Sequence, residues 1–204
     1  MIIYLSDRAN QITMLGLLAS GTALYFAQSG KPELAIAAAL WAVLADHFDG
    51  VVAKRTKNRS AETANMGKSL DGFADLLYGA VIPAAVLMQI GTGGVLPFVT
   101  GLALILAGAL RLSYFSNFGM SAKGYFTGVP LSYDVPLMAV LLLIAAWIPV
   151  PLWNTATCGL FLLLAVLHVL PIAVPSMNRT MYAAVTVFAV VASIFLAYRG
   201  FSAG

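Results

Sequence analysis

The chain has 204 residues, of which 61% are hydrophobic and only 9% are charged, and its mean hydropathy is +0.91. An ordinary soluble domain carries about 25% charged residues, so this composition argues against a soluble protein and indicates an integral membrane protein. The net charge is +3, but the basic residues lie in short segments between apolar runs, which is how membrane topology is set. Nucleic-acid binding is therefore not expected.

Long apolar runs recur along the whole chain. A hydrocarbon core about 30 Å thick needs about 20 apolar residues per helix, so residues 1–204 are predicted to form a single all-α membrane domain. We expect a bundle of about seven transmembrane helices, within a range of about six to eight. The predicted spans, bounded by Gly, Pro and charged residues, are 12–28, 33–54, 67–90, 94–116, 131–149, 153–173 and 180–198.

The basic residues predict the orientation of these spans. If the N-terminus is in the cytoplasm, only Lys31 and Arg199 of the 11 Lys and Arg residues lie on the non-cytoplasmic side of the membrane. This distribution agrees with the positive-inside rule. The residues then on the cytoplasmic side are Arg8, Lys54, Arg55, Lys57, Arg59, Lys68, Arg111, Lys123 and Arg179.

Two pairs of aspartates stand at the cytoplasmic ends of the second and third spans. Asp46 and Asp49 are three residues apart, and Asp71 and Asp75 are four apart, so each pair shares one face of its helix. Carboxylates within a membrane helix are costly, and the nearby Lys and Arg side chains are too few to compensate four of them. A bound cation is the simplest partner.

Hard oxygen ligands without a cysteine cluster favour Mg²⁺ or Mn²⁺ over zinc. Four carboxylates from two helices suit two such ions, which is the usual arrangement for neutralising a pyrophosphate during displacement at phosphorus. The small residues Gly50, Ala53 and Gly67 on the same faces allow a nucleotide to approach the backbone. Close packing between helices in lipid uses small residues equally well, and both interpretations remain open here.

The pattern Asp-x2-Asp-Gly-x2-Ala, followed by Gly-x3-Asp-x3-Asp, resembles the motif of the CDP-alcohol phosphotransferase family. The matching positions are Asp46, Asp49, Gly50, Ala53, Gly67, Asp71 and Asp75. This resemblance implies a helical membrane bundle whose metal site opens to the cytoplasm. It also implies an enzyme that transfers a phosphatidyl or phospho-alcohol group from a CDP-linked donor to an alcohol and releases CMP.

The resemblance assigns roles to individual residues. Asp46, Asp49, Asp71 and Asp75 would hold the metal ions, and Asp75 would also act as the catalytic base. The residues implied for the nucleotide are Asp46, Gly50, Ala53, Lys54, Arg55 and Gly67. A homodimer in the cell membrane or an inner membrane is expected on the same basis.

Two departures from the family pattern stand out. The family has arginine after the alanine, whereas this chain has Lys54 followed by Arg55, and either residue can take that role. The segment before Gly67 is also longer than usual by about one helical turn. The polar stretch 56–65 is expected to absorb this extra length as a loop.

Two later segments, 111–118 and 125–130, resemble the phosphatidylserine synthase branch of the family. On this basis the donor is expected to be CDP-diacylglycerol and the acceptor L-serine. Arg111, in the last turns of an apolar helix, and Lys123, in the following loop, are expected to bind substrate through a donor phosphate or an acceptor carboxylate, and Lys123 equally suits a charge that only sets topology. Tyr114 stands where that branch has a second arginine, so glycerol phosphate and inositol phosphate remain as alternative acceptors.

Other polar residues have simpler interpretations. His47 points about 100° away from Asp46 on a helix, which favours packing or a role behind the metal ligands. Asn10 and Asp134 are interpreted as helix caps, with binding of an acceptor amine as the alternative for Asp134, and His168 is interpreted as a partner in an interhelical hydrogen bond.

A cation- or proton-coupled transporter is the main alternative function, because carboxylates inside a membrane also mark ion pathways. Transporters place such groups near the midplane and show internal repeats, whereas these aspartates lie at one edge and the chain shows no repeat. A structural or adaptor protein would not need the four clustered acids at all.

Overall fold

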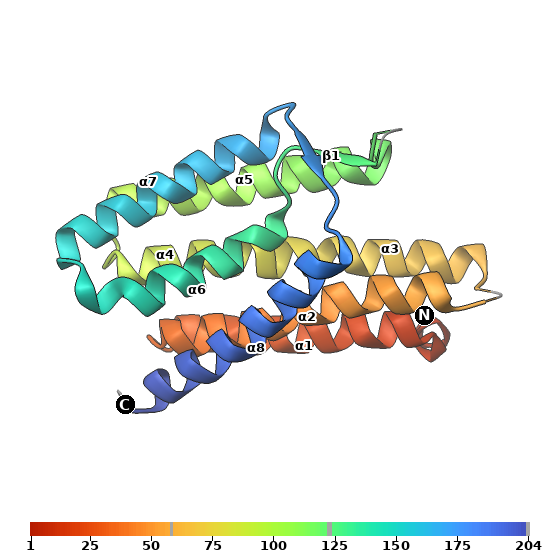
Figure 1. Cartoon of the computed structure of the whole chain (residues 1–204), viewed down its shortest axis with the longest axis horizontal. Helices are drawn as coiled ribbons and strands as arrows, with labels where there is room; N and C mark the ends of the chain where they lie inside the picture. Colours follow the sequence, from red (N-terminus) through yellow and green to blue (C-terminus); the bar gives the residue numbers. More distant parts are fainter. Residues whose placement is uncertain (58, 122–123, 203–204) are drawn as a thin grey trace.

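A computed structural model of the chain describes residues 1–57, 59–121 and 124–202. The fold is almost entirely helical (Figure 1). Its α-helices are α1 (Arg8–Gln28), α2 (Pro32–Arg55), α3 (Ala61–Leu76), α4 (Ile82–Ile90), α5 (Val95–Phe118), α6 (Asp134–Ile144), α7 (Val150–Val169) and α8 (Arg179–Ser202). The shorter elements are η1 (Ile2–Ser6), η2 (Leu77–Val81), η3 (Leu131–Tyr133), η4 (Ala145–Trp147), β1 (Tyr125–Thr127) and β2 (Ala173–Pro175).

The prediction of an all-α membrane bundle is confirmed. Because α3, η2 and α4 form one continuous helix, Ala61–Ile90, the described residues make seven long or medium helices. By length and composition, the helices able to cross a membrane are Pro32–Arg55, Ala61–Ile90, Val95–Phe118, Val150–Val169 and Arg179–Ser202, five in all. The segment Leu131–Trp147 is apolar but shorter, and it is flanked by 3-10 turns rather than being one regular span.

The third helix begins earlier than predicted. Its first residue is Ala61 rather than residue 67, because the Ser60 side chain caps it by accepting a hydrogen bond from the Thr63 backbone N–H at 3.2 Å. Glu62 in the first turn favours the same start through the helix dipole. The expected loop 56–65 is therefore wrong: most of the extra length lies in the first turns of α3.

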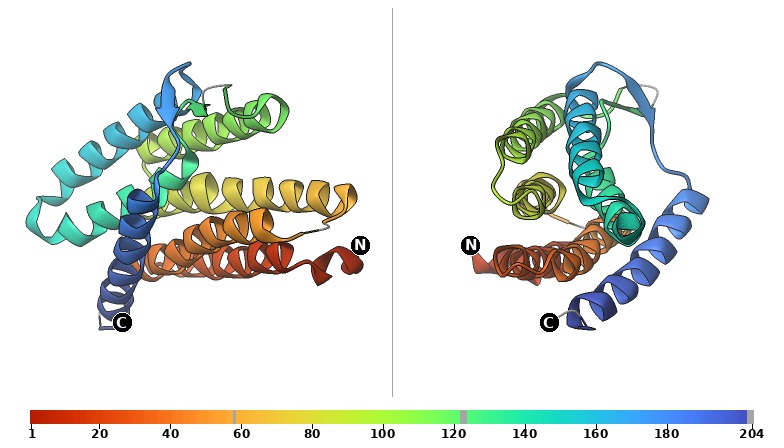
Figure 2. Two further views of the ribbon diagram at one scale, coloured as in Figure 1. Left: turned by 45° about the vertical axis from the view of Figure 1, so that its right-hand side comes forward. Right: turned by 90° about the vertical axis from the view of Figure 1, so that its left-hand side faces the viewer.

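Helix α2 is the centre of the bundle. It packs against α1, α3, α4, α6 and α8, and its alanine side chains at positions 35, 39 and 42 are almost fully buried. Such small side chains let neighbouring helices approach closely, which substitutes for a hydrophobic driving force inside lipid. Figure 2 shows α5 and α7 lying above the layer formed by α1 and α2, while α8 crosses the bundle obliquely.

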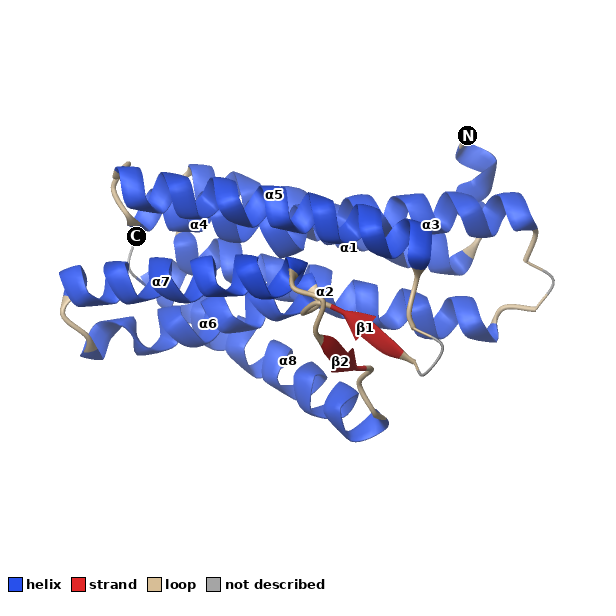
Figure 3. Ribbon diagram, turned by 90° about the horizontal axis from the view of Figure 1, so that it is seen from above, coloured by secondary structure: helices blue, strands red, loops and turns tan. Residues whose placement is uncertain are grey.

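The chain runs up and down through this bundle. Helix α1 begins on the same side of the molecule where α2 ends and α3 begins (Figure 1). A two-stranded antiparallel sheet, with Phe126 opposite Val174, joins the connection after α5 to the connection before α8 (Figure 3). This sheet ties together two segments that are nearly fifty positions apart in the sequence.

The continuous helix 61–90 widens in its middle. The segment η2 is π-helical and ends just before Pro83, which has no backbone N–H and whose ring conflicts with the carbonyl group one turn earlier. A π-helical turn accommodates that conflict without ending the helix. Asp75 and Tyr78 therefore lie where the helix changes its winding.

A buried hydrogen-bonded pair connects α6, α7 and the segment after β1. His168 Nε2 lies 3.1 Å from Asp134 Oδ1, and its Nδ1 lies 2.7 Å from the carbonyl oxygen of Val129. Both the His168 and the Asp134 side chains are completely inaccessible to solvent. The predicted interhelical hydrogen bond of His168 is confirmed. Asp134, however, does not cap α6, so that interpretation was wrong: its carboxylate faces His168 instead.

Glycine is required beside this pair. Gly128 has φ of 75°, and a Cβ atom there would overlap the carbonyl oxygen of His168. Its backbone N–H donates to the carbonyl of Ile172 at 2.9 Å, so the segment before α6 lies directly against the end of α7.

We expect His168→Ala to destabilise the protein by about 3 kcal/mol, because the Asp134 carboxylate would stay buried without its partner. For a chain of this size that loss corresponds to a decrease in Tm of about 6–12 °C, measurable by thermal unfolding in detergent. His168→Gln, which keeps a donor and an acceptor, is the control and should lose clearly less. Equal Tm values for His168→Ala and the wild type would contradict a structural role for the pair.

Candidate active site

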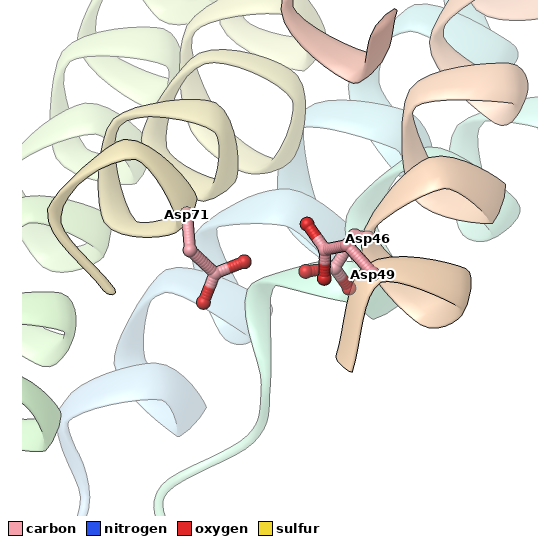
Figure 4. Close-up of side chains that lie close together, drawn as sticks. All are labelled: Asp46, Asp49 and Asp71. Atoms are coloured by element: carbon pink, nitrogen blue, oxygen red, sulfur yellow. The ribbon is translucent and has the colours of Figure 1, made fainter. Parts of the chain in front are cut away.

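Three aspartates converge where α2 and α3 face each other. Asp46, Asp49 and Asp71 each present a carboxylate oxygen, and these three oxygens lie within 4.8 Å of one another. Figure 4 shows Asp71 pointing from α3 toward Asp46 and Asp49 on α2. The packing of the two helices brings Asp71 of α3 to the Asp46 and Asp49 pair of α2.

The fourth predicted aspartate belongs to the same region but not to that group of three. Asp75 lines a cavity together with Asp46, Asp49 and Asp71. Its Oδ1 accepts a hydrogen bond of 2.8 Å from the hydroxyl of Tyr78, whose ring is buried. This bond fixes the Asp75 side chain toward the π-helical turn.

The aspartates fit a divalent cation. Three carboxylate oxygens at this spacing are hard ligands of the kind that Mg²⁺, Mn²⁺ and Ca²⁺ prefer, and the group contains neither Cys nor His. Asp49 is additionally oriented by Thr13, whose hydroxyl donates to its Oδ2. A cation offsets the mutual repulsion of the acids, which no ion pair to these aspartates does within the described part of the chain.

The acids lie between two cavities. The larger has a volume of about 410 Å³ and is lined by all four aspartates and by residues of α5, η3 and α8. The smaller, of about 170 Å³, lies among α1, α2 and α3. Asp49, Gly50 and Asp71 line both, so a group held at the carboxylates is accessible from either side.

The smaller cavity contains three of the residues implied for the nucleotide. Gly50, Ala53 and Gly67 line it. A Cβ atom added at Gly50 would meet nothing within 4 Å, so this glycine leaves open space rather than allowing a helix to pack closely. Gly67 differs, because a Cβ there would overlap Asn10 and lie 2.5 Å from Arg59 Nη2.

Sequence reasoning missed the polar wall of this smaller cavity. Asn10, Thr13 and Arg59 also line it. Asn10 is fully buried; its amide donates to the carbonyls of Tyr4 (2.9 Å) and Thr63 (3.4 Å), and its Oδ1 accepts from Arg59 at 2.6 Å. The interpretation of Asn10 as a cap was therefore wrong.

The cap of α1 is Asp7, which accepts from the Asn10 backbone N–H at 3.0 Å and pairs with Arg59 at 3.1 Å. One signal in the sequence pointed to this wall. Asn10 and Thr13 are three apart and so share one face of the first helix.

The predicted basic residues are distributed unevenly. Lys54 is exposed and lines the larger cavity. Arg55 is exposed and, as far as the described residues show, lines neither cavity. Arg111 is buried and lines the larger cavity. Lys123 lies outside the described residues.

A model of the family described as CDP-alcohol phosphatidyltransferase matches residues 7–191 of the chain. That match covers the aspartate cluster, both cavities and about the first half of α8. The chain belongs to the CDP-alcohol phosphatidyltransferase family. Membership indicates a transferase of phosphate-containing groups, so the transporter and adaptor alternatives are set aside.

Two curated relatives of the chain are both described as CDP-diacylglycerol–serine O-phosphatidyltransferases. The CDP-diacylglycerol–serine O-phosphatidyltransferase of Saccharomyces cerevisiae is 33% identical over 145 residues, covering 64% of this chain and 51% of the yeast protein. The protein of the same description from Bacillus subtilis is 32% identical over 118 residues, covering 56% of this chain and 62% of its own length. The chain thus matches between about half and three fifths of the length of these relatives.

Proposed function

We propose that the protein transfers a phosphatidyl group from CDP-diacylglycerol to the hydroxyl group of L-serine and releases CMP. The observation that carries this proposal is the aspartate cluster between two cavities in a membrane bundle of this family. The choice of serine rests on the two relatives, both described as serine phosphatidyltransferases.

The smaller cavity is assigned to the nucleotide end of the donor. Its backbone is open at Gly50, and Arg59 and Lys68 supply positive charge for phosphate. Arg59 is itself held by Asp7 and Asn10, so it is oriented before a nucleotide binds. Of the basic pair after Ala53, only Lys54 is among the described residues that line a cavity, and that cavity is the larger one.

Asp46, Asp49, Asp71 and Asp75 are proposed to hold Mg²⁺ or Mn²⁺, with two ions as the expected number. When bound, such ions neutralise the pyrophosphate of the donor and stabilise the charge that develops on the phosphoryl oxygens. The three carboxylate oxygens within 4.8 Å support this assignment.

The chain's own residues then act on the acceptor from the larger cavity. Asp75 accepts the proton of the serine hydroxyl, and the oxygen forms a bond to the phosphorus that carries the lipid. The bond between that phosphorus and the CMP oxygen breaks, and CMP leaves. Tyr78 positions Asp75 for this step through its 2.8 Å hydrogen bond.

The membrane orientation follows from the same proposal. The site lies at the side of the bundle where α1 begins and α2 ends, and most of the basic residues flank the helices on that side. The positive-inside rule then places the site toward the cytoplasm. Water-soluble serine and CMP would enter and leave there, while the tails of the donor remain in lipid.

The test is CMP release by the purified protein in lipid nanodiscs containing CDP-diacylglycerol. We expect release that requires Mg²⁺ or Mn²⁺, is abolished by a chelator, and occurs with L-serine but not with glycerol phosphate or inositol phosphate. Metal-dependent CMP release with one of the other acceptors would support the proposed transfer reaction and would identify that acceptor in place of serine. No release with any of them would contradict CDP-diacylglycerol as the donor.

A further inference from the structure

His47 is buried beside the metal ligands without a use in the proposed mechanism. It lies between Asp46 and Asp49 on α2, is 9% exposed, and lines the larger cavity. Neither of its ring nitrogens has a hydrogen-bond partner among the described residues. The residue therefore borders the cavity, while both of its ring nitrogens are buried and lack a partner among the described residues.

Such an arrangement is unusual for a histidine that only packs. A buried donor or acceptor without a partner costs free energy, and most buried polar atoms in proteins are paired. The contrast is His168, whose two ring nitrogens both have partners. The unpaired nitrogens of His47 indicate that a ligand in the larger cavity completes its hydrogen bonding.

Arg111 is a second residue at the same cavity with a donor that lacks a partner. Its side chain is 7% exposed, its Nε atom has no hydrogen-bond partner, and no ion pair holds its guanidinium group within the described chain. Arg59 and Arg199, by contrast, each pair with a carboxylate. A buried arginine with free donors is well suited to a carboxylate.

The location of the two donors separates them from the nucleotide. Asp49, Gly50 and Asp71 line both cavities, whereas His47 and Arg111 line only the larger one. They come from α2 and α5, two helices that both border the larger cavity. If the smaller cavity takes the nucleotide, the larger is left for the acceptor.

We propose that His47 and Arg111 together bind the carboxylate of an amino-acid acceptor, with a ring N–H of His47 as one of the donors. This inference rests on the proposed transfer to serine. Tyr182 at the start of α8 holds the imidazole in place, since the two rings are 5.3 Å apart between centroids and nearly perpendicular at 81°. His47 is then a determinant of acceptor specificity, beyond the packing role that the sequence suggested.

Two substitutions of His47 separate binding from packing. His47→Phe keeps a ring against Tyr182 but removes the N–H, whereas His47→Gln removes the ring and keeps a donor. A hydrogen bond to a charged group corresponds to about a 10- to 100-fold change in affinity. We therefore expect His47→Phe to raise the KM for L-serine by about 10- to 100-fold, and His47→Gln to recover much of that loss.

The KM for CDP-diacylglycerol and the dependence on metal concentration should change by less than about twofold in both variants, because His47 does not line the smaller cavity. Phe48→Ala is the matched control. Phe48 follows His47 directly in the sequence, but its side chain is 51% exposed and it is not among the residues lining the larger cavity. All kinetic constants should stay near those of the wild type in this control.

The outcomes distinguish this inference from the proposed function. If His47→Phe keeps serine-dependent activity with an unchanged KM for serine, the proposed role of His47 is overturned, and the proposed transfer to serine still stands. The same holds if His47→Gln is the more impaired variant, because packing would then be what matters. A wild-type protein with no serine-dependent release would overturn the proposed acceptor, and the carboxylate assignment with it.

Discussion

Replacing Asp71 by asparagine is expected to lower metal-dependent CMP release by at least about 1,000-fold. Asp71 is the only member of the three-carboxylate group that comes from α3. Within this group it therefore supplies the one ligand by which α3 would bind a cation together with the two aspartates of α2. Asparagine has nearly the same shape and retains an oxygen atom, but it lacks the negative charge that binds a divalent cation. The loss should appear together with weaker binding of Mn²⁺, measured by calorimetry in the presence of CMP.

Glu62→Gln is the matched control for this experiment. Glu62 is an exposed carboxylate on the same helix and is not among the residues lining either cavity. Its neutralisation should leave both the rate and Mn²⁺ binding near the wild-type values. Asp71→Asn protein that is folded and retains more than about a tenth of the activity would contradict a metal site at this group.

Asp75→Asn is expected to reduce kcat by about 100- to 10,000-fold, which is the usual contribution of a general base. Asp75 is proposed to hold metal as well, but it lies outside the group of three, so we expect Mn²⁺ affinity to fall much less than in Asp71→Asn. The Tyr78 hydroxyl can still donate to the amide oxygen, and the side chain should therefore keep its position. Activity and Mn²⁺ binding are measured on the same preparation.

The comparison of the two measurements decides the role of Asp75. A large fall in kcat with retained metal binding supports the role of base. Parallel losses of metal binding and kcat would show that Asp75 acts chiefly as a metal ligand, which the family resemblance also implies. Full activity in this variant would exclude both roles.

The number of helices and the facing aspartate pairs were predictable because both depend on local sequence. Apolar runs of sufficient length specify membrane helices wherever they occur, and spacings of three and four residues place side chains on one helical face. Boundaries were less predictable where polar residues extend a helix beyond the apolar run. Ser60 and Glu62 start α3 at Ala61, ahead of the predicted span 67–90, and hydropathy carries no information about such a cap.

The roles of isolated polar residues needed the fold. Asn10 and Asp134 each stand near the start of a helix, where a cap is the common use of such residues. Their actual partners are Arg59 and His168, which lie far away in the sequence. No local pattern predicts a contact of that kind, because it depends on how each helix is rotated against its neighbours.

By itself the sequence determined the membrane bundle, its family and the four aspartates at one edge, because hydropathy and helical spacing are properties of short segments. Only the tertiary structure decided that Asn10, Thr13 and Arg59 form the wall of one cavity and that His47 and Arg111 meet at another. Those groupings join residues of different helices, and their positions follow from the packing of side chains between α1, α2, α3 and α5 rather than from the order of residues along any one of them.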